Sequence, residues 1–329
     1  MEQRSTSAGQ GMGWLPVASL LLAMLLWASS FVALKLAFRS YHPMVVIFGR
    51  MFIASLCFLA FIPSFRRIRF RRRDLKYLVI MAVCEPCLYF VFEAKAMQYT
   101  TASQAGMITA MMPLLVAVLA WTFLRERVSP LTLVGFMMAI AGACWLSLAS
   151  VSDAYAPNPM LGNFYEFIAM ICAAGYTVAL KHLSADYPPL FMTAFQAFLG
   201  SLFFFPFLLL PQTVLPTEFI LVPALAILYL GIFITLAAYA CYNFGVSRVP
   251  ASQAAGFVNL IPVFAVILAM LILGETMNFQ QYLASGLVFI GVLVSRHGGK
   301  TLPPEVTAPL ESAGSLTATG DSALSQTGP

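Results

Sequence analysis

The sequence predicts an all-α membrane protein with ten transmembrane helices arranged as two inverted five-helix repeats. Three observations support this prediction. Hydrophobic residues make up 60% of the 329 residues and charged residues only 9%, whereas about a quarter of the residues of a soluble domain are charged. Apolar runs of about 20 residues, each long enough to cross a bilayer, recur along the chain. The tetrapeptide ASQA occurs twice, at Ala102 to Ala105 and at Ala251 to Ala254.

Charged, proline-containing or Asn/Ser/Thr-containing breaks divide the apolar runs into ten predicted helices. The first run is too long for a signal-peptide core, so it is expected to remain as a membrane span. The first five helices are expected over 14–37, 43–63, 75–97, 101–124 and 130–150. The second five are expected over 162–182, 189–210, 219–244, 251–273 and 279–296.

The two halves of the chain match each other well beyond ASQA. An offset of 149 residues aligns six further identical positions, among them Pro113 with Pro262, Glu126 with Glu275 and Gly142 with Gly291. An offset of 146 residues aligns Lys35, Tyr41 and Pro43 with Lys181, Tyr187 and Pro189. Matches of Lys, Tyr, Pro, Gln and Glu do not arise from composition alone in so apolar a chain. We therefore interpret the chain as a duplicated five-helix unit.

The domain boundaries and orientation follow from this duplication. A cytoplasmic tail (1–13) precedes the first repeat (14–150), a connecting loop (151–161) leads to the second repeat (162–296), and a disordered cytoplasmic tail (297–329) follows. Because five is odd, the second repeat enters the membrane from the opposite side. Most Lys and Arg then fall on the side of the two termini, which predicts that both termini are cytoplasmic. Inverted repeats are typical of secondary transporters that work by alternating access.

Several motifs at equivalent positions resemble a known family. These are WASSFVALK in the first helix, YHPMVVIFGR in the second, and TASQAG and PASQAAG, each followed by Pro and Glu, in the fourth and ninth. The pattern is similar to the drug/metabolite transporter superfamily, specifically its EamA-type exporters. The resemblance implies that helices 1, 3, 4, 6, 8 and 9 line a central cavity and that helices 5 and 10 pack peripherally. It also implies export of small molecules, without specifying which.

Charged residues inside predicted spans are the main candidates for substrate binding, because an intramembrane charge is costly and usually functional. Glu85 lies near the middle of the third helix, and Tyr89 and Glu93 follow on the same face. Glu85 is expected to bind a substrate amine or a coupling proton, or else to form a structural pair with Arg50 or a buried hydrogen bond. Arg50 in the second helix would contact a substrate carboxylate or neutralise Glu85 or Glu93. Glu93 is expected nearer the outer surface.

Other candidates are uncharged. Substrate contacts are also predicted at Trp27, Tyr176, Tyr239, Asn243 and Asn259, although aromatic residues in bundles often serve packing alone. Gating or hinge roles are predicted at Gln104, Gln253, Pro113 and Pro262. The alternative for the two Gln residues is helix-start capping, with Ser103 and Ser252 as N-caps. Glu126 and Glu275 are interpreted as fold residues near the start of the next helix, where Ser129 and Asn278 are cap candidates.

These predictions together describe a multi-pass carrier of a bacterial-type inner membrane. It would export a small polar metabolite, an amino acid or amine-like compound, without enzymatic activity, cofactor or metal. The expected partners are the small-molecule substrate, membrane lipids and protons as a candidate coupling ion, with no nucleic acid, in a monomer or homodimer. The basic run FRRIRFRRRDLK is interpreted as a cytoplasmic loop beside anionic lipid. The alternatives are a lipid or lysolipid flippase, and a membrane thiol oxidoreductase that uses Cys84 and Cys87 of the CEPC sequence.

Overall fold

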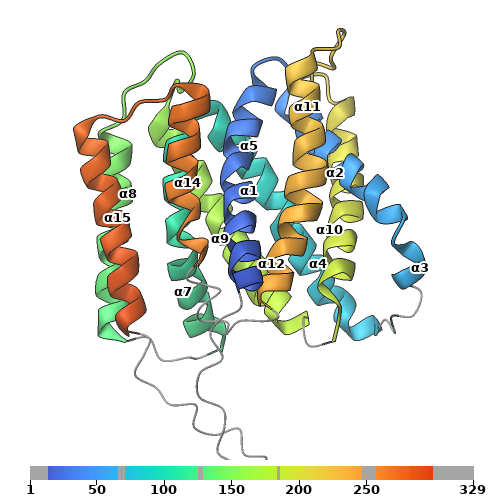
Figure 1. Ribbon diagram of the computed structural model, residues 1–329, viewed down its shortest axis with the longest axis horizontal. Helices are drawn as coiled ribbons and strands as arrows, with labels where there is room; N and C mark the ends of the chain where they lie inside the picture. The colour runs from blue at the N-terminus through green and yellow to red at the C-terminus, as the bar shows by residue number, and fades with distance from the viewer. Residues whose placement is uncertain are drawn as a thin grey trace, which may run out of the picture.

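A computed structural model describes residues 14–65, 68, 71–124, 129–183, 186–246 and 257–298. This part of the chain is helical and contains no strand. The helices stand roughly side by side, with α1 in the middle of the molecule (Figure 1). The predicted all-α fold class is therefore confirmed.

The first half contains the elements expected from the apolar runs, with interruptions that the sequence analysis did not anticipate. They are α1 (Trp14–Phe38), α2 (Pro43–Leu59), the short α3 (Ile62–Phe65), η1 (Arg72–Asp74), α4 (Leu75–Ala82), η2 (Val83–Leu88), α5 (Tyr89–Tyr99), α6 (Ala102–Ile108), η3 (Thr109–Met111), α7 (Met112–Leu124) and α8 (Pro130–Leu148). The third predicted helix thus consists of α4 and α5 joined through η2, a segment that contains a kink at Glu85.

The second half follows a similar order. Its elements are α9 (Pro159–Leu183), α10 (Pro189–Phe204), η4 (Phe205–Leu209), α11 (Leu221–Tyr229), η5 (Leu230–Ala238), α12 (Tyr239–Val246), α14 (Ile261–Leu268), η6 (Ala269–Leu273) and α15 (Phe279–Gly298). The beginning of the predicted ninth helix, with Gln253 and Ser252, lies outside the described residues.

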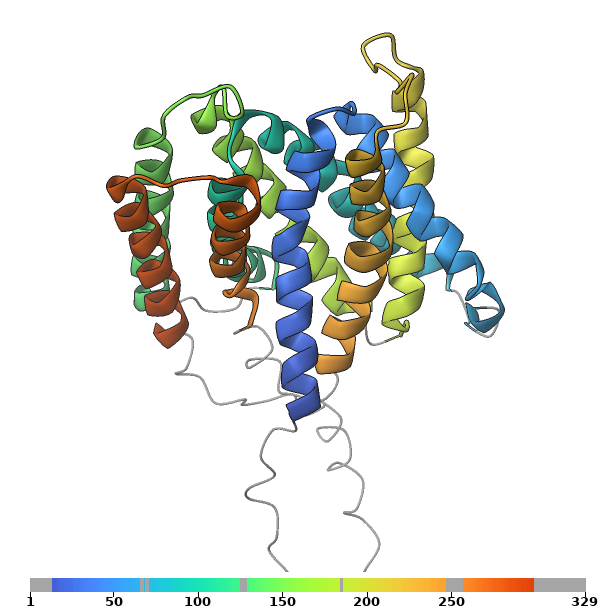
Figure 2. The ribbon, with the colours of Figure 1, turned by 45° about the horizontal axis from the view of Figure 1, so that its top comes forward.

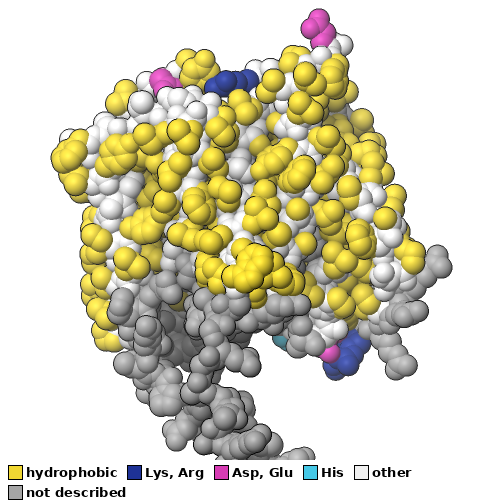
Figure 3. All heavy atoms as spheres, in the orientation of Figure 1, with side chains coloured by type: hydrophobic (Ala, Val, Ile, Leu, Met, Phe, Trp, Pro, Cys, Tyr) yellow, Lys and Arg dark blue, Asp and Glu magenta, His cyan; other side chains and the backbone are white. Residues whose placement is uncertain are grey.

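Seven helical segments of the described chain are long and apolar enough to cross a membrane. They are Trp14–Phe38, Arg72–Tyr99, Ala102–Leu119, Pro130–Leu148, Pro159–Leu180, Pro189–Leu209 and Leu221–Tyr242. Three shorter apolar helices, Pro43–Leu59, Ile261–Leu273 and Phe279–Ser295, lie at the remaining predicted positions. Hydrophobic side chains cover much of the face shown in Figure 3, as expected for a surface in contact with lipid.

Polar side chains fix the starts of several helices. Ser129 accepts a hydrogen bond from the backbone N–H of Thr132 at the start of α8, and Asn278 accepts one from Gln281 N–H at the start of α15. His42 precedes α2 and accepts a hydrogen bond from Met44 N–H. Desolvation lowers the pKa of His42, which favours the neutral imidazole that this bond requires.

The N-cap prediction at Ser103 is wrong. Thr101 is the N-cap of α6, and its hydroxyl accepts a hydrogen bond from Gln104 N–H. The helix begins two residues earlier than a cap at Ser103 would allow, because Thr101 already has extended backbone geometry. Ser103 is therefore the second helical residue, and its hydroxyl is free to bond elsewhere.

Small residues bring α8 and α15 into close contact at one edge of the bundle. Figures 1 and 2 both show the two helices side by side at the edge distant from α10. A Cβ atom on Gly291 would lie 2.6 Å from the backbone nitrogen of Ala139 and 2.6 Å from the carbonyl oxygen of Gly135. A Cβ atom on Gly142 would lie 2.7 Å from Val288 N. Backbone approach of this kind is the usual basis of helix association in membranes.

We predict that Gly291→Ala destabilises the protein and that Gly286→Ala does not. Both substitutions add one methyl group to α15, but a Cβ on Gly286 meets no atom within 4 Å, whereas one on Gly291 meets backbone at 2.6 Å. The crowding at Gly291 is expected to cost about 1 to 3 kcal/mol. Thermal unfolding in detergent measures the difference. Equal midpoints for the two variants would contradict the close helix contact.

Candidate functional site

A cavity of about 180 Å³ lies between helices of both halves. Residues lining it include Trp27 on α1, Arg50 on α2, Thr109 on η3, Tyr176 on α9, Thr193 on α10 and Tyr239 on α12. The third predicted helix contributes Glu85, Tyr89, Phe90 and Glu93. No lining residue belongs to the described parts of α8 or α15. The cavity thus draws on the six helices that the resemblance implies and, in addition, on α2 and α10.

Glu85 lies where the third helix is interrupted. Its backbone is non-helical, with φ −146° and ψ 120°, and Pro86 follows, which cannot donate a backbone hydrogen bond. The Gln196 side chain donates a hydrogen bond of 2.6 Å to the Glu85 carbonyl oxygen. The Glu85 carbonyl oxygen at the interruption is therefore hydrogen-bonded to a side chain of α10, which belongs to the other half.

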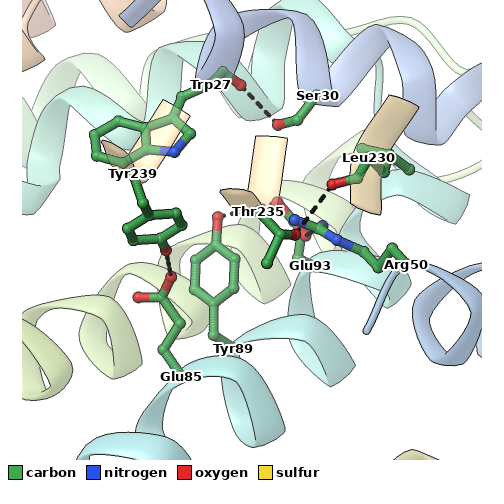
Figure 4. Close-up of polar contacts among 9 residues, drawn as sticks. All are labelled: Trp27, Ser30, Arg50, Glu85, Tyr89, Glu93, Leu230, Thr235 and Tyr239. Carbon is green, nitrogen blue, oxygen red and sulfur yellow. Dashed lines mark hydrogen bonds and ion pairs between the residues drawn. The ribbon is translucent and has the colours of Figure 1, made fainter. Parts of the chain in front are cut away.

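The Glu85 side chain points into the cavity. Tyr239 donates a hydrogen bond of 2.7 Å from its hydroxyl to Glu85 Oε1 (Figure 4). Tyr239 in turn packs edge to face against Trp27, with ring centroids 5.3 Å apart. Glu85 is only partly buried, so its carboxyl group remains available to a ligand. Trp27, Tyr176 and Tyr239 all lie at the cavity, as the sequence analysis predicted for substrate contacts.

Arg50 pairs with Glu93. The Arg50 Nη1 atom lies 3.8 Å from Glu93 Oε2, and both side chains are buried. The guanidinium also lies over the Phe90 ring, 4.2 Å from its centroid. Tyr89 donates a hydrogen bond of 3.0 Å to Glu93 Oε1. Of the partners expected for Arg50, the structure therefore selects Glu93.

Glu93 is expected nearer the outer surface than Glu85, and its depth in a membrane stays a prediction. In the structure only 2% of the residue is exposed, and it lines the cavity beside Arg50. The helix continues to Tyr99, two residues beyond the predicted end at 97. The neighbouring Lys95 lies on the opposite, exposed face of α5.

The Arg50 and Glu93 pair is only partly satisfied. At 3.8 Å the two charged groups are in contact without a hydrogen bond, and neither Arg50 Nε nor Glu93 Oε2 has a hydrogen-bond partner among the described residues. A buried guanidinium normally has its donors occupied, preferably by a carboxylate in bidentate geometry. Arg50 therefore keeps donor capacity for an anionic group that enters the cavity.

The remaining predicted residues lie elsewhere. Asn259 is buried, its Oδ1 atom has no partner among the described residues, and it is not part of the cavity lining. The Asn243 side chain and all of Gln253 lie outside the described residues. Pro113 lies inside the continuous helical span Ala102–Leu119, just after the 3-10 turn η3 that joins α6 to α7. Pro262 lies in the first turn of α14, a position that tolerates proline. A hinge role at either proline stays a prediction.

Gln104 lies outside the cavity, in a buried polar network at one end of the bundle. Its Oε1 atom accepts hydrogen bonds from Asn163 Nδ2 at 2.9 Å and from Ser150 at 2.7 Å. Thr100 donates to Asn163 Oδ1 at 2.7 Å. The network joins α6, α9 and the end of α8, which are elements of both halves.

Glu275 connects the two halves at the same end of the bundle. Its carboxylate accepts hydrogen bonds from Ala102 N–H, Ser103 N–H and the Ser103 hydroxyl, all between 2.7 and 2.8 Å. A carboxylate at a helix N-terminus also interacts favourably with the helix dipole. Glu275 was predicted to stabilise the start of the following helix, and this prediction is wrong. Glu275 instead binds the first turn of α6, in the other half.

The sequence analysis missed Glu166 and the hydroxyl groups of Thr109 and Thr193. Glu166 is a single carboxylate within an apolar run, so the rule that selected Glu85 could also have selected it. Threonine hydroxyls give no such signal, because threonine is common in membrane helices and bonds to its own backbone. Thr109 and Thr193 both do so here, donating to Gly106 O and Pro189 O respectively.

The model of the EamA-like transporter family matches this sequence twice, over residues 14–148 and 160–296. The chain belongs to this family. The two matches also show the two-repeat organisation of the family, and the protein is a multi-pass membrane protein of a transporter family.

Individual EamA relatives have similar lengths. The uncharacterized transporter YetK of Bacillus subtilis is 29% identical over 284 residues, covering 84% of this chain and 85% of its own. An uncharacterized transporter of Archaeoglobus fulgidus is 28% identical, covering 85% and 97%. A probable terminal-alkyne amino-acid exporter of Streptantibioticus cattleyicolor is 25% identical, covering 84% and 92%. A solved crystal structure with a TM-score of 0.58 and 18% identity covers 85% of this chain and 96% of its own, and shows the fold alone.

We predict that Arg50→Met lowers the free energy of unfolding by about 3 kcal/mol, because it leaves Glu93 as a buried carboxylate without its cation. The double variant Arg50→Met with Glu93→Gln should recover most of this loss, since Gln can still accept the hydrogen bond from Tyr89. Chemical denaturation in detergent measures both. If the single variant is as stable as wild type, the buried ion pair does not exist.

Proposed function

We propose that this EamA-family protein is a secondary transporter that exports a small polar metabolite, an amino acid or amine-like compound, across the inner membrane by alternating access. The observation that carries this proposal is the presence of Glu85 and Arg50 at one cavity between the two halves. A carboxylate suits a substrate ammonium group, and a guanidinium with free donor capacity suits a carboxylate. An amino acid carries both groups. One relative is named a probable amino-acid exporter, which supports this substrate class.

The proposed mechanism needs two halves that are inverted in the membrane. Reciprocal contacts between equivalent residues support the inversion. With an offset of 149, Gly135 corresponds to Ala284 and Gly142 to Gly291, and the backbone of Gly135 lies against Gly291 while that of Gly142 lies against Ala284. Two surfaces that exchange equivalent residues in this way are related by a two-fold axis.

The α2 and α10 helices provide a second, independent sign of the same axis. Ser55 and Ser201 are equivalent at the offset of 146, and their hydroxyl groups are hydrogen-bonded to each other at 2.9 Å. An atom that contacts its own equivalent must lie on or near a two-fold axis. Along the contact between α8 and α15, residue numbers rise in one helix as they fall in the other, so the two helices are antiparallel. A two-fold axis that relates antiparallel helices is perpendicular to them. In a bilayer this is an axis in the membrane plane.

One end of the cavity is closed in this conformation by contacts between the halves. The Glu275 carboxylate binds the first turn of α6, and Gly106 of α6 packs against Ala265 of α14. Opening this end requires these contacts to separate. We interpret them as the closed gate of one access state. Gln104 lies at the same closed end. Its side chain accepts a hydrogen bond from Asn163 of α9 and does not cap a helix.

The orientation and partners follow from the same proposal. With both termini cytoplasmic, the Arg-rich segment before α4 faces the cytoplasm, as the positive-inside rule requires. The closed end then faces outward. Protons are the proposed coupling ion. The flippase and thiol oxidoreductase alternatives are not favoured, because the relatives are named transporters and one is named an amino-acid exporter.

We predict that Glu85→Gln reduces transport at least tenfold in proteoliposomes. The assay is counterflow with radiolabelled amino acids and aliphatic amines, screened as a panel. Gln is isosteric with Glu and can accept the hydrogen bond from Tyr239, so the loss would reflect the missing charge. Glu218→Gln makes the same change at an exposed position and should transport at the wild-type rate.

Two results would contradict this proposal. If wild-type protein gives no counterflow with any compound of the panel, the proposed substrate class is wrong. If a compound is transported equally by wild type and Glu85→Gln, the role of Glu85 is wrong. In a parallel assay, replacing Cys84 and Cys87 with Ala is expected to leave transport unchanged. Loss of transport in this variant would show that the two thiols are needed, as the thiol oxidoreductase alternative requires.

A further inference from the structure

Glu166 is a buried carboxyl group that the proposed substrate contacts do not use. The residue is 0% exposed, and neither of its side-chain oxygens has a hydrogen-bond partner among the described residues. On α9 it lies between Asn163, which belongs to the polar network of the closed end, and Met170, which lines the cavity. An unpartnered carboxyl at such a depth is expensive unless it binds something.

Glu166 also lies beside the helix that carries Glu93. α9 packs along α5, and the ring of Tyr165, next to Glu166, stacks on the ring of Phe92, next to Glu93, with centroids 6.4 Å apart. Glu93 is paired with Arg50 and lines the same cavity as Glu85. This part of the bundle therefore contains three carboxyl groups and one guanidinium. If all four were ionised, the interior would carry two unbalanced negative charges. Two like charges at this depth cannot both stay uncompensated, so the group requires up to two further cations.

The other elements packed against α9 supply no cation that could compensate Glu166. α6, η3 and α7 contain no ionisable residue. α8 carries only Cys144, which is exposed. The remaining ionisable groups on neighbouring elements are Lys76 and Tyr77 on α4, Cys84, Glu85 and Cys87 on η2, and Tyr89, Glu93, Lys95 and Tyr99 on α5. Lys76 is exposed and lies over Tyr77, and Lys95 is exposed and lies over Tyr165, so neither is buried with Glu166.

We propose that Glu166, together with Glu93, forms a proton-binding site separate from the substrate contacts at Glu85 and Arg50. A proton is the cation that fits, because the described residues include no group of three or more His, Cys, Asp or Glu side chains that could hold a metal ion. The site binds one proton on Glu166 when Glu93 is ionised and paired with Arg50. When a substrate ammonium group enters beside Glu85, it supplies one of the missing positive charges, and the proton leaves to water. Substrate and proton thereby compete, as exchange of one for the other requires.

This inference rests on the proposed function for its role in transport, but the proton site itself can be tested without a substrate. The measurement is infrared difference spectroscopy of the reconstituted full-length protein, titrated with pH. Wild type should show a band of protonated carboxyl groups at pH 7. Glu166→Gln should lose the intensity of one carboxyl, and the exposed control Glu218→Gln should keep the wild-type band. An unchanged band in Glu166→Gln would overturn the proposal. If that variant does not fold, Glu166→Met, which matches the apolar surroundings, replaces it.

A transport measurement then tests the coupling. For an amino acid or amine transported by wild type, accumulation is compared with and without an imposed pH gradient. Wild type and Glu218→Gln should show a several-fold increase with the gradient, and Glu166→Gln should show a ratio near one. An unchanged ratio in Glu166→Gln would overturn the coupling role. Absence of transport by wild type would instead refute the proposed function, while the infrared result would still decide whether the proton site exists.

Discussion

Close contact between equivalent helices of the two halves determines where everything else in this protein can lie. Lipid gives membrane helices no hydrophobic reason to associate, so backbone approach through small residues must hold them together. Gly135, Gly142 and Gly291 provide that approach between α8 and α15 at one edge. At the other side of the bundle, Ser55 and Ser201 join α2 to α10. Most of the helices that line the cavity lie between these two contacts, and the cavity forms where their polar residues meet.

The cavity is defined by an excess of negative charge. Arg50 balances one carboxylate, Glu93, and among the described residues Glu85 and Glu166 have no cation of their own. The bundle tolerates this because Glu85 opens to the cavity and receives a hydrogen bond from Tyr239. A transporter benefits from such incomplete compensation, because a site that is fully satisfied when empty gains nothing by binding a substrate. The proposed division of labour assigns the amine to Glu85 and the proton to Glu166.

The sequence predicts the apolar helices and the duplication well, because both depend on local composition and on matches such as ASQA and Pro113 with Pro262. Glu85 and Arg50 could be selected because charges are rare and costly within membrane helices. Which way a side chain faces was harder to predict. The near-complete burial of Glu93 was not predicted and Glu166 was overlooked, since the direction in which a side chain faces depends on tertiary packing. The interruption at Glu85 had a local signal in Pro86, but the bond from Gln196 that accommodates it comes from the other half. The partners of Glu275 could not be predicted for the same reason. Ala102 and Ser103 precede it in the chain by 173 and 172 positions.

The central claim is that the two halves are inverted, and it can be tested by labelling from each side of the membrane. Ser40 and Asp186 precede α2 and α10, are equivalent at the offset of 146, and are both exposed. The six natural cysteines are first replaced. Ser40→Cys and Asp186→Cys are then introduced separately and treated with a membrane-impermeant maleimide in intact cells and in inverted vesicles. The account predicts that Ser40→Cys is labelled only in cells and Asp186→Cys only in inverted vesicles. Labelling of both from the same side would contradict the inverted arrangement and the alternating access built on it.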